Sequence, residues 1–207
     1  MSLVTRPATT PFALALCVGV LALSAGCAGP KTEGQKKMSQ LSEQMQSLGT
    51  ALEASKAQLQ KTLEAHDLLV ANADADLSGN FSRFQSSIET CNATQKKIGT
   101  LMDQISATSI AYFAGWEADL ARIDNSELRQ SSEARMAQVK SRLEQVQSQI
   151  ATTKAAFEPL MQVLNDHLVY LSNDLTLDAV ASLAKDSAKL RQDVGSVYTA
   201  IDQGVPP

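Results

Sequence analysis

Apolar residues recur in alternating steps of three and four along residues 77–123, and the positions between them are mostly polar or small. The stops of this pattern are Leu77, Phe81, Phe84, Ile88, Cys91, Gln95, Ile98, Met102, Ile105, Ser109, Tyr112, Trp116, Asp119 and Ile123. A seven-residue repeat with two apolar positions is typical of a helix that packs along another helix. Such a helix spans about 60 to 70 Å and cannot bury its own seam, so the pattern predicts partner helices of similar length.

The same periodicity predicts three further helices, over residues 35–73, 127–173 and 177–202. Short polar segments separate them, and short connections between long helices place consecutive helices antiparallel. The last helix is shorter and is expected to fold back on the end of the third. The sequence therefore predicts an all-α fold, an elongated antiparallel bundle or coiled coil of about four helices over residues 35–203.

Residues that cap or interrupt helices mark the boundaries between these predicted elements. The candidate helix starts are Asp74, Asp76, Ser78, Asn125 and Ser126. A turn is expected at residues 72–79, where Gly79 is a weak point in the first turn of the second helix. Pro159 lies inside the third helix, and an interior proline removes one backbone hydrogen bond, so we expect a kink or a break there.

The first 26 residues have the layout of a secretion signal. A single base, Arg6, precedes an uncharged apolar run at residues 12–23. This run is shorter than the about 20 residues that a membrane-spanning helix needs. Small residues follow, and they lead to Gly26 and Cys27.

A small-residue run that ends in Gly26-Cys27 resembles the lipobox of bacterial lipoproteins, although Ser24 stands where that family prefers leucine. The resemblance implies that the signal is cut between Gly26 and Cys27 and that Cys27 carries acyl chains such as palmitate. Ala28 in place of an aspartate resembles lipoproteins that reach the outer membrane, where the chain would face the periplasm. The alternative is a plain secretory signal that is cut nearby, with Cys27 an ordinary thiol.

The predicted organisation is a signal at residues 1–26, a lipidated cysteine with a short tether at 27–34, the helical domain at 35–203 and a tail at 204–207. An extended tether of seven residues reaches at most about 25 Å, so the helical domain is expected to stay near the membrane. Cys17 leaves with the signal and Cys27 carries lipid, which excludes a disulfide within the mature chain. The net charge of −4, with dispersed bases, argues against a nucleic-acid partner.

His66 and His167 are the only histidines, and both fall on seam positions. If the first and third helices are neighbours, the two form a conceivable metal pair. Metal sites in helical bundles normally supply glutamates and Glu-x-x-His sequences, however, and this chain has no such sequence. Polar residues that fix the helix register are therefore the favoured interpretation, and no metal or cofactor is predicted.

Other chemically capable side chains have plainer explanations. Cys91 lies on the seam without a neighbouring histidine, so a buried packing residue is favoured over a reactive thiol. Tyr112 and Trp116 also lie on the seam, beside Phe113, and core packing is favoured over a ligand-stacking patch. No glycine-rich phosphate loop and no positioned catalytic base is present, so no catalytic residue is predicted.

Several short sequences from Trp116 onward resemble a bacterial family catalogued as domain of unknown function 2959. They are Trp116-Glu117 with Leu120, Leu128-Arg129, Ser131-Ser132-Glu133 with Arg135, FEPL at 157–160, HLVYLSN at 167–173 and AVASL at 179–183. The resemblance is strongest over residues 112–195, and Ser172-Asn173 departs from a more basic family sequence. It implies a helical, often coiled-coil fold with frequent export signals, and it implies no activity.

These features predict a non-enzymatic, lipid-anchored protein of the bacterial cell envelope. Its long helices would act as a spacer or as an interaction scaffold for a partner protein or for a second copy. The alternative is a periplasmic ligand-binding module in the wider apolar region at residues 157–171 and the fourth helix. A cavity there, with His167 or Tyr170 at its mouth, would favour the alternative, and a packed region would not.

Overall fold

The structure, a computed structural model, describes residues 31–71 and 73–204. Its helices are α1 (Glu33–Ala71), α2 (Ala73–Leu120), α3 (Ser126–Asn173), α4 (Leu177–Leu183), the 3₁₀ turn η1 (Ala184–Asp186) and α5 (Ser187–Gly204). No strand occurs in these ranges, so the all-α prediction is confirmed. None of the helices described has a stretch apolar and long enough to cross a membrane. The predicted signal and Cys27 lie outside the described residues.

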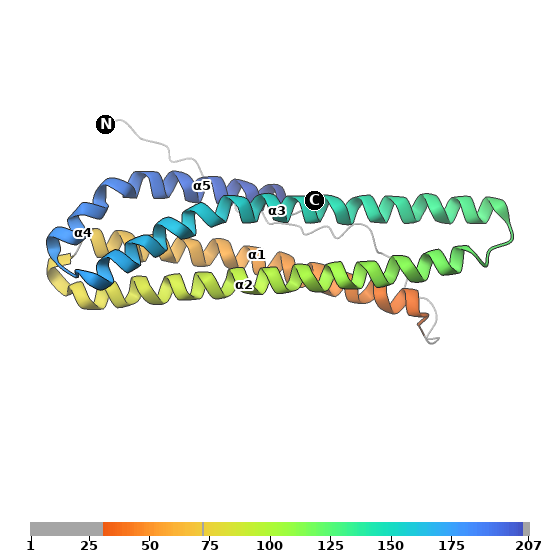
Figure 1. Cartoon of the computed structure of the whole chain (residues 1–207), viewed down its shortest axis with the longest axis horizontal. Coiled ribbons are helices and arrows are strands. Elements are labelled where there is room, and N and C mark those ends of the chain that lie inside the picture. Colours follow the sequence, from red (N-terminus) through yellow and green to blue (C-terminus); the bar gives the residue numbers. More distant parts are fainter. Residues whose placement is uncertain (1–30, 72, 205–207) are drawn as a thin grey trace, which may run out of the picture. The chain divides into compact units, whose positions relative to one another are not determined.

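The helices form two antiparallel pairs (Figure 1). Helix α1 packs along α2, and this is the most extensive contact between any two elements. Helix α5 packs back along the C-terminal half of α3, as predicted for the last helix, and α4 joins the two around the end of the bundle. Packing between the two pairs, α2 against α3 and α1 against α5, is sparser. We call the α1–α2 pair the first hairpin, α3 to α5 the second hairpin, and the surface between them the junction.

The predicted seams are the buried faces of the helices. One continuous core contains the seam residues of both hairpins. Its fully buried large side chains are Leu59, Leu69, Phe84, Ile88, Ile105, Phe157, Leu160, Leu164, Leu171, Leu190 and Ile201. Towards the connection between α2 and α3 the seam opens, because Tyr112 and Trp116 are only half-buried and Asp119 is exposed.

Asp76 starts the regular part of α2. Its backbone is extended (φ −157°, ψ 70°), and its Oδ1 accepts a hydrogen bond from the backbone N–H of Gly79 over 3.0 Å. This is the geometry of an N-terminal cap, and it satisfies a donor that has no partner within the helix. A Cβ atom at residue 79 would collide with the Asp76 carboxylate, so the cap needs the glycine that appeared as a weak point in the sequence.

We expect Asp76→Ala to lower the free energy of unfolding by about 1 kcal/mol, because the first turn of α2 loses its side-chain cap. Urea denaturation followed by circular dichroism measures this change. Ser78→Ala is the matched control, since Ser78 is exposed and its hydroxyl makes no hydrogen bond in the described structure. Equal effects of the two substitutions would contradict the assignment of the cap.

Asn125 caps α3, as predicted. Its Oδ1 accepts hydrogen bonds from the backbone N–H groups of Glu127 and Leu128, each over 3.0 Å. Helix α2 ends at Leu120, three residues before the predicted end. Residues 121–125 form the connection, and the carbonyl of Ile123 accepts hydrogen bonds from the Arg129 guanidinium.

Of the kink or break predicted at Pro159, the break does not occur, because helix α3 continues through this residue. Residues 155 and 159 are both exposed, and water can therefore satisfy the carbonyl of Ala155 that lacks a donor. On the other face, Leu160 and Met161 are buried in the core and hold the helix in place. Figure 1 shows that α3 changes direction along its C-terminal half.

The predicted fourth helix, residues 177–202, is interrupted, which corrects the sequence-based expectation. Helix α4 ends at Leu183, η1 follows, and α5 starts at Ser187. Thr176 caps α4 by accepting from the backbone N–H of Ala179 over 3.3 Å. The interruption places Asp186 of η1 beside His167 of α3, a contact that periodicity alone does not reveal.

Candidate functional site

The structure brings the two histidines together inside the bundle. His66 of α1 and His167 of α3 have ring centroids 5.4 Å apart with an interplanar angle of 24°. Their exposed fractions are 0% and 6%. Phe84 of α2 meets His66 edge-on, with the centroids 5.5 Å apart. One histidine comes from each hairpin, so the pair lies at the junction.

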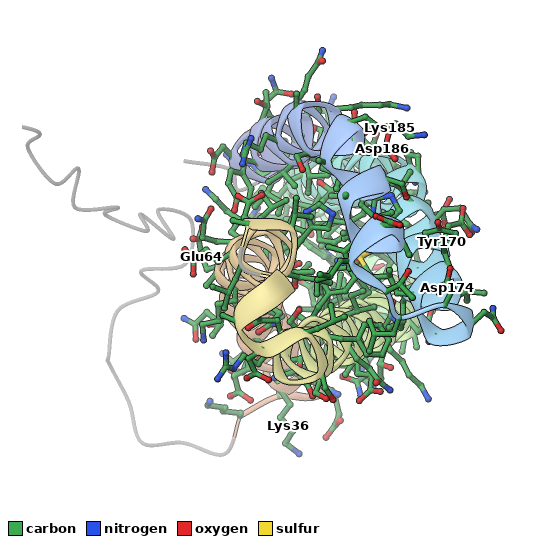
Figure 2. The ribbon with its side chains drawn as sticks, turned by 90° about the vertical axis from the view of Figure 1, so that its left-hand side faces the viewer. Lys36, Glu64, Tyr170, Asp174, Lys185 and Asp186 are labelled. Carbon is green, nitrogen blue, oxygen red and sulfur yellow. The ribbon has the colours of Figure 1, made fainter. Side chains whose placement is uncertain are left out.

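Most of the hydrogen-bonding capacity of this pair is unused. His167 Nε2 lies 3.3 Å from Asp186 Oδ2, within hydrogen-bond distance of a carboxylate oxygen that can only accept. In the described structure, both ring nitrogens of His66 and Nδ1 of His167 have no hydrogen-bond partner. His66 Nδ1 lies 3.8 Å from Asp67 Oδ1, beyond hydrogen-bond distance. Figure 2 looks onto this end of the bundle, with Asp186 on the side of the second hairpin.

Burial lowers the pKa of His66 from 6.5 to about 4, because the charged imidazolium would lose its hydration in the core. The positive charge of a protonated His167 lowers this pKa further, and the carboxylate of Asp67 opposes the shift. That carboxylate is shared, since Arg191 of α5 donates to Asp67 Oδ2 over 2.9 Å. His66 is therefore neutral at pH 7.

The pair does not form a recognisable metal centre. Within residues 31–71 and 73–204, no three His, Cys, Asp or Glu side chains are grouped so that they could hold a metal ion. Two imidazoles alone provide fewer protein ligands than the three or four that bind zinc in most sites. The arrangement is better described as two stacked imidazole rings that pack in the core and keep two hairpins in register.

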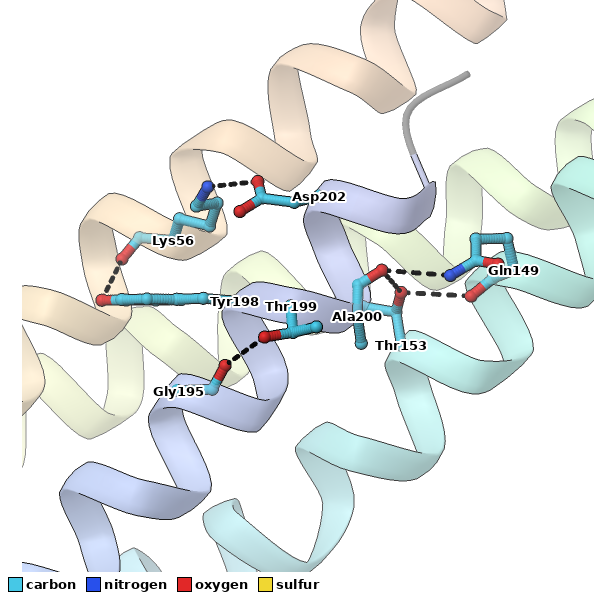
Figure 3. A network of polar contacts seen from close by, with 8 residues as sticks. All are labelled: Lys56, Gln149, Thr153, Gly195, Tyr198, Thr199, Ala200 and Asp202. Atoms are coloured by element: carbon cyan, nitrogen blue, oxygen red, sulfur yellow. Dashed lines mark hydrogen bonds and ion pairs between the residues drawn. The ribbon is translucent and has the colours of Figure 1, made fainter. Parts of the chain in front are cut away.

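Polar contacts tie the second hairpin to the first along α5 (Figure 3). Lys56 of α1 pairs with Asp202 over 2.5 Å. The hydroxyl of Tyr198 donates to the carbonyl of Lys56 over 3.3 Å. Within the second hairpin, Thr153 of α3 donates to the carbonyl of Ala200 over 3.2 Å. The two hairpins are thus joined by a few specific contacts in addition to the shared core.

Cys91 is fully buried on α2, as predicted for a packing residue. Burial raises the pKa of its thiol to about 11, while the neighbouring Thr62 hydroxyl of α1 opposes the shift. A thiolate is the reactive form of cysteine, so this thiol is unreactive at neutral pH while the core is closed.

Tyr112, Phe113 and Trp116 form an aromatic cluster near the connection between α2 and α3. The three side chains are half-buried rather than fully in the core. The ring of Tyr112 lies 5.4 Å from those of Phe113 and Trp116, measured between centroids. Trp116 Nε1 donates to the Ser132 hydroxyl over 2.9 Å, which joins α2 to α3. Ser132 therefore has a structural partner that the sequence patterns did not identify.

The predicted alternative, a ligand pocket around residues 157–171, is not favoured. Five apolar side chains of this segment are buried in the core, namely Phe157, Leu160, Met161, Leu164 and Leu171, whereas Val169 is exposed. Tyr170 is 43% exposed on the outside of the bundle, where its hydroxyl accepts from Ser182. The recess beside α5 measures only about 230 Å³, and its lining includes three charged residues, Asp186, Lys189 and Asp193.

A larger, open groove of about 760 Å³ separates α2 from α3 along part of the junction. Its lining includes the apolar side chains of Ile98, Ile150 and Phe157, and the polar residues Gln95 and Lys154 contribute as well. The groove explains why α2 and α3 pack against each other less extensively than α1 and α2 do.

The fold and the buried junction define an all-α antiparallel bundle protein. The sequence profile of the family described as "Protein of unknown function (DUF2959)" matches residues 29–206. The chain belongs to this family, in agreement with the resemblance noted from Trp116 onward. No curated protein and no solved structure matches the chain.

Proposed function

We propose that the chain is a non-enzymatic lipoprotein of the bacterial envelope that acts as a spacer or interaction scaffold. Acylated Cys27 would hold it on the periplasmic face of the outer membrane. The long helices would carry contacts for a partner protein or a second copy away from the membrane. The lipobox-like sequence that ends at Cys27 motivates the anchor.

The proposal rests on one combined observation: the helices are long, and the first of them begins close to the lipobox-like cysteine. Helix α1 begins at Glu33, six residues after Cys27, and six extended residues reach at most about 20 Å. Helices α2 and α3 have 48 residues each, which corresponds to about 70 Å of helix. A rigid element of this length on a short tether suits a spacer.

Exposed apolar side chains near the connection between α2 and α3 support the scaffold part of the proposal. Ile110 and Leu128 are 69% and 62% exposed, and large apolar side chains are enriched where proteins bind one another. The scaffold role predicts that chemical cross-linking in intact cells captures an envelope protein or a second copy of the chain. A chain that stays monomeric and uncaptured contradicts this role and leaves the anchor in place.

We expect Cys27→Ala to release the protein from membranes, because the acyl chains each contribute about 0.8 kcal/mol per buried CH₂ group. Fractionation and intact mass spectrometry measure the change. The wild-type protein should lack residues 1–26 and carry acyl mass.

Cys17→Ala is the matched control for this substitution, because the cleaved signal takes Cys17 with it. It should leave both membrane attachment and acyl mass unchanged. Wild-type protein without acyl mass would refute the anchor, and the chain would then be a freely secreted helical protein.

A further inference from the structure

Across the junction, α2 contacts α3 and α1 contacts α5 less extensively than the helices within each hairpin contact each other, and α4 adds smaller contacts to α1 and α2. Helices α2 and α3 are separated by the open groove along part of their length. Helices α1 and α5 share fewer contacts than α1 and α2 do. Each hairpin buries much of its seam within itself, so a change that weakens the junction need not melt the helices.

Two titratable rings face each other across this surface, one from each hairpin. His66 and His167 lie 5.4 Å apart between centroids and are almost completely buried. Protonation of both would place two positive charges side by side in the core. Like charges at this distance repel strongly where water is excluded, and both ions would lose hydration.

The surrounding charges compensate only part of this cost. From α1, Asp67 lies near His66, but Arg191 of α5 already binds that carboxylate. From η1, Asp186 accepts from His167. From α2, the group that faces His66 is the uncharged ring of Phe84. A protonated His66 would therefore share the carboxylate of Asp67 with Arg191.

We propose that the His66–His167 pair is an acid-sensitive latch, and that protonation separates the second hairpin from the first at this end of the bundle while the helices persist. The pair has two features that a switch needs: it links two separately folded hairpins, and imidazole rings gain positive charge in acid. Acid would thereby expose junction surface that is buried at neutral pH. This inference does not depend on the proposed anchor or on the scaffold role.

The thiol of Cys91 can report the separation of the two hairpins, because it is part of the natural sequence and is buried in the closed bundle. Its buried thiol lies against Thr62, about one turn of α1 from His66. It belongs to the same core cluster as Val194 and Val197 of α5, so side chains of both hairpins contribute to the core that buries it. Separation of the hairpins would give a small reagent access to this thiol.

The experiment uses the full chain with Cys17→Ala and Cys27→Ala, in which Cys91 is the single thiol. The rate of Cys91 modification by 4,4′-dithiodipyridine, which reacts with thiols in acid, is measured from pH 7.5 to pH 4. Each rate is divided by that of the urea-unfolded chain at the same pH. Circular dichroism at 222 nm reports helix content in parallel.

We expect the normalised rate to rise about tenfold or more as the pH falls, with most of the helix signal retained. In His66→Phe/His167→Phe the rise should disappear. His66→Leu, which removes the titrating ring with a smaller side chain, replaces the double variant if the latter is not helical at pH 7.5. Asp202→Asn is the control for acid titration of an ion-pair carboxylate that does not face the histidines, and its rise should persist.

Three outcomes would overturn the latch. The first is continued protection of Cys91 down to pH 4. The second is the same acid response in the histidine variants, which would assign the response to other groups. The third is simultaneous loss of protection and helix signal, which would mean unfolding of the whole bundle rather than separation of its hairpins.

Discussion

Phe84→Ala is expected to lower the free energy of unfolding by about 3 to 5 kcal/mol. Phe84 is completely buried on α2 and meets His66 edge-on. Its removal deletes a large apolar surface and leaves a cavity beside two polar rings. A marginally stable domain has only about 5 to 15 kcal/mol of total stability, so this change is a large share of it.

Phe81→Ala provides the matched comparison, because Phe81 lies one turn away on the same helix and is only partly buried. Its loss should cost distinctly less, about 1 to 2 kcal/mol, since the truncated side chain leaves a smaller enclosed void. Urea denaturation at pH 7.5 gives both values. Similar losses for the two variants would show that Phe84 is not the principal packing residue at the histidine pair.

The second large effect is the dependence of stability on pH. His66 has a pKa of about 4 in the folded chain, against an ordinary value of 6.5. Between these pH values the unfolded chain binds more protons at this residue than the folded chain, so acid favours unfolding. The stabilising effect of a neutral His66 is therefore fully present above pH 6.5 and is lost as the pH falls towards 4.

Each pH unit in this window corresponds to about 1.4 kcal/mol, so the total loss is on the order of 3 kcal/mol. The measurement is the free energy of unfolding of the wild type and of His66→Phe at several pH values between 7 and 4. The difference between the two proteins should change steadily across this window, with the wild type losing more. Parallel curves would contradict a buried neutral His66, whatever the constant offset between them at pH 7.

The helices themselves could be predicted because their signals are local. The seam predicted over residues 77–123 is the buried face of α2, where Phe84, Ile88 and Ile105 are completely buried. Asn125 caps α3 because its side chain reaches N–H groups only two and three residues away. A repeat of seven and a capping side chain both act within a few turns of helix, so a single sequence contains all the information that they need.

Other features of the candidate site could be predicted only in part from the sequence. His66 and His167 could be placed on seams and named as a conceivable pair, but not brought to a defined distance. Pro159 indicated a kink or a break without deciding between them, and burial of Leu160 and Met161 on the opposite face stabilises the continuous helix. The interruption at η1 left no periodic signal, yet it places Asp186 beside His167.

By itself, the sequence determined that this protein consists of long amphipathic helices, where most of them begin and end, and which faces they bury. Only the tertiary structure decided that α1 pairs most closely with α2, that α2 and α3 leave a groove, and that the two histidines meet at the junction. The physical reason is that an apolar seam specifies burial but not its partner. The choice among seams depends on the fit of side chains from segments far apart in the chain, such as His66 and His167.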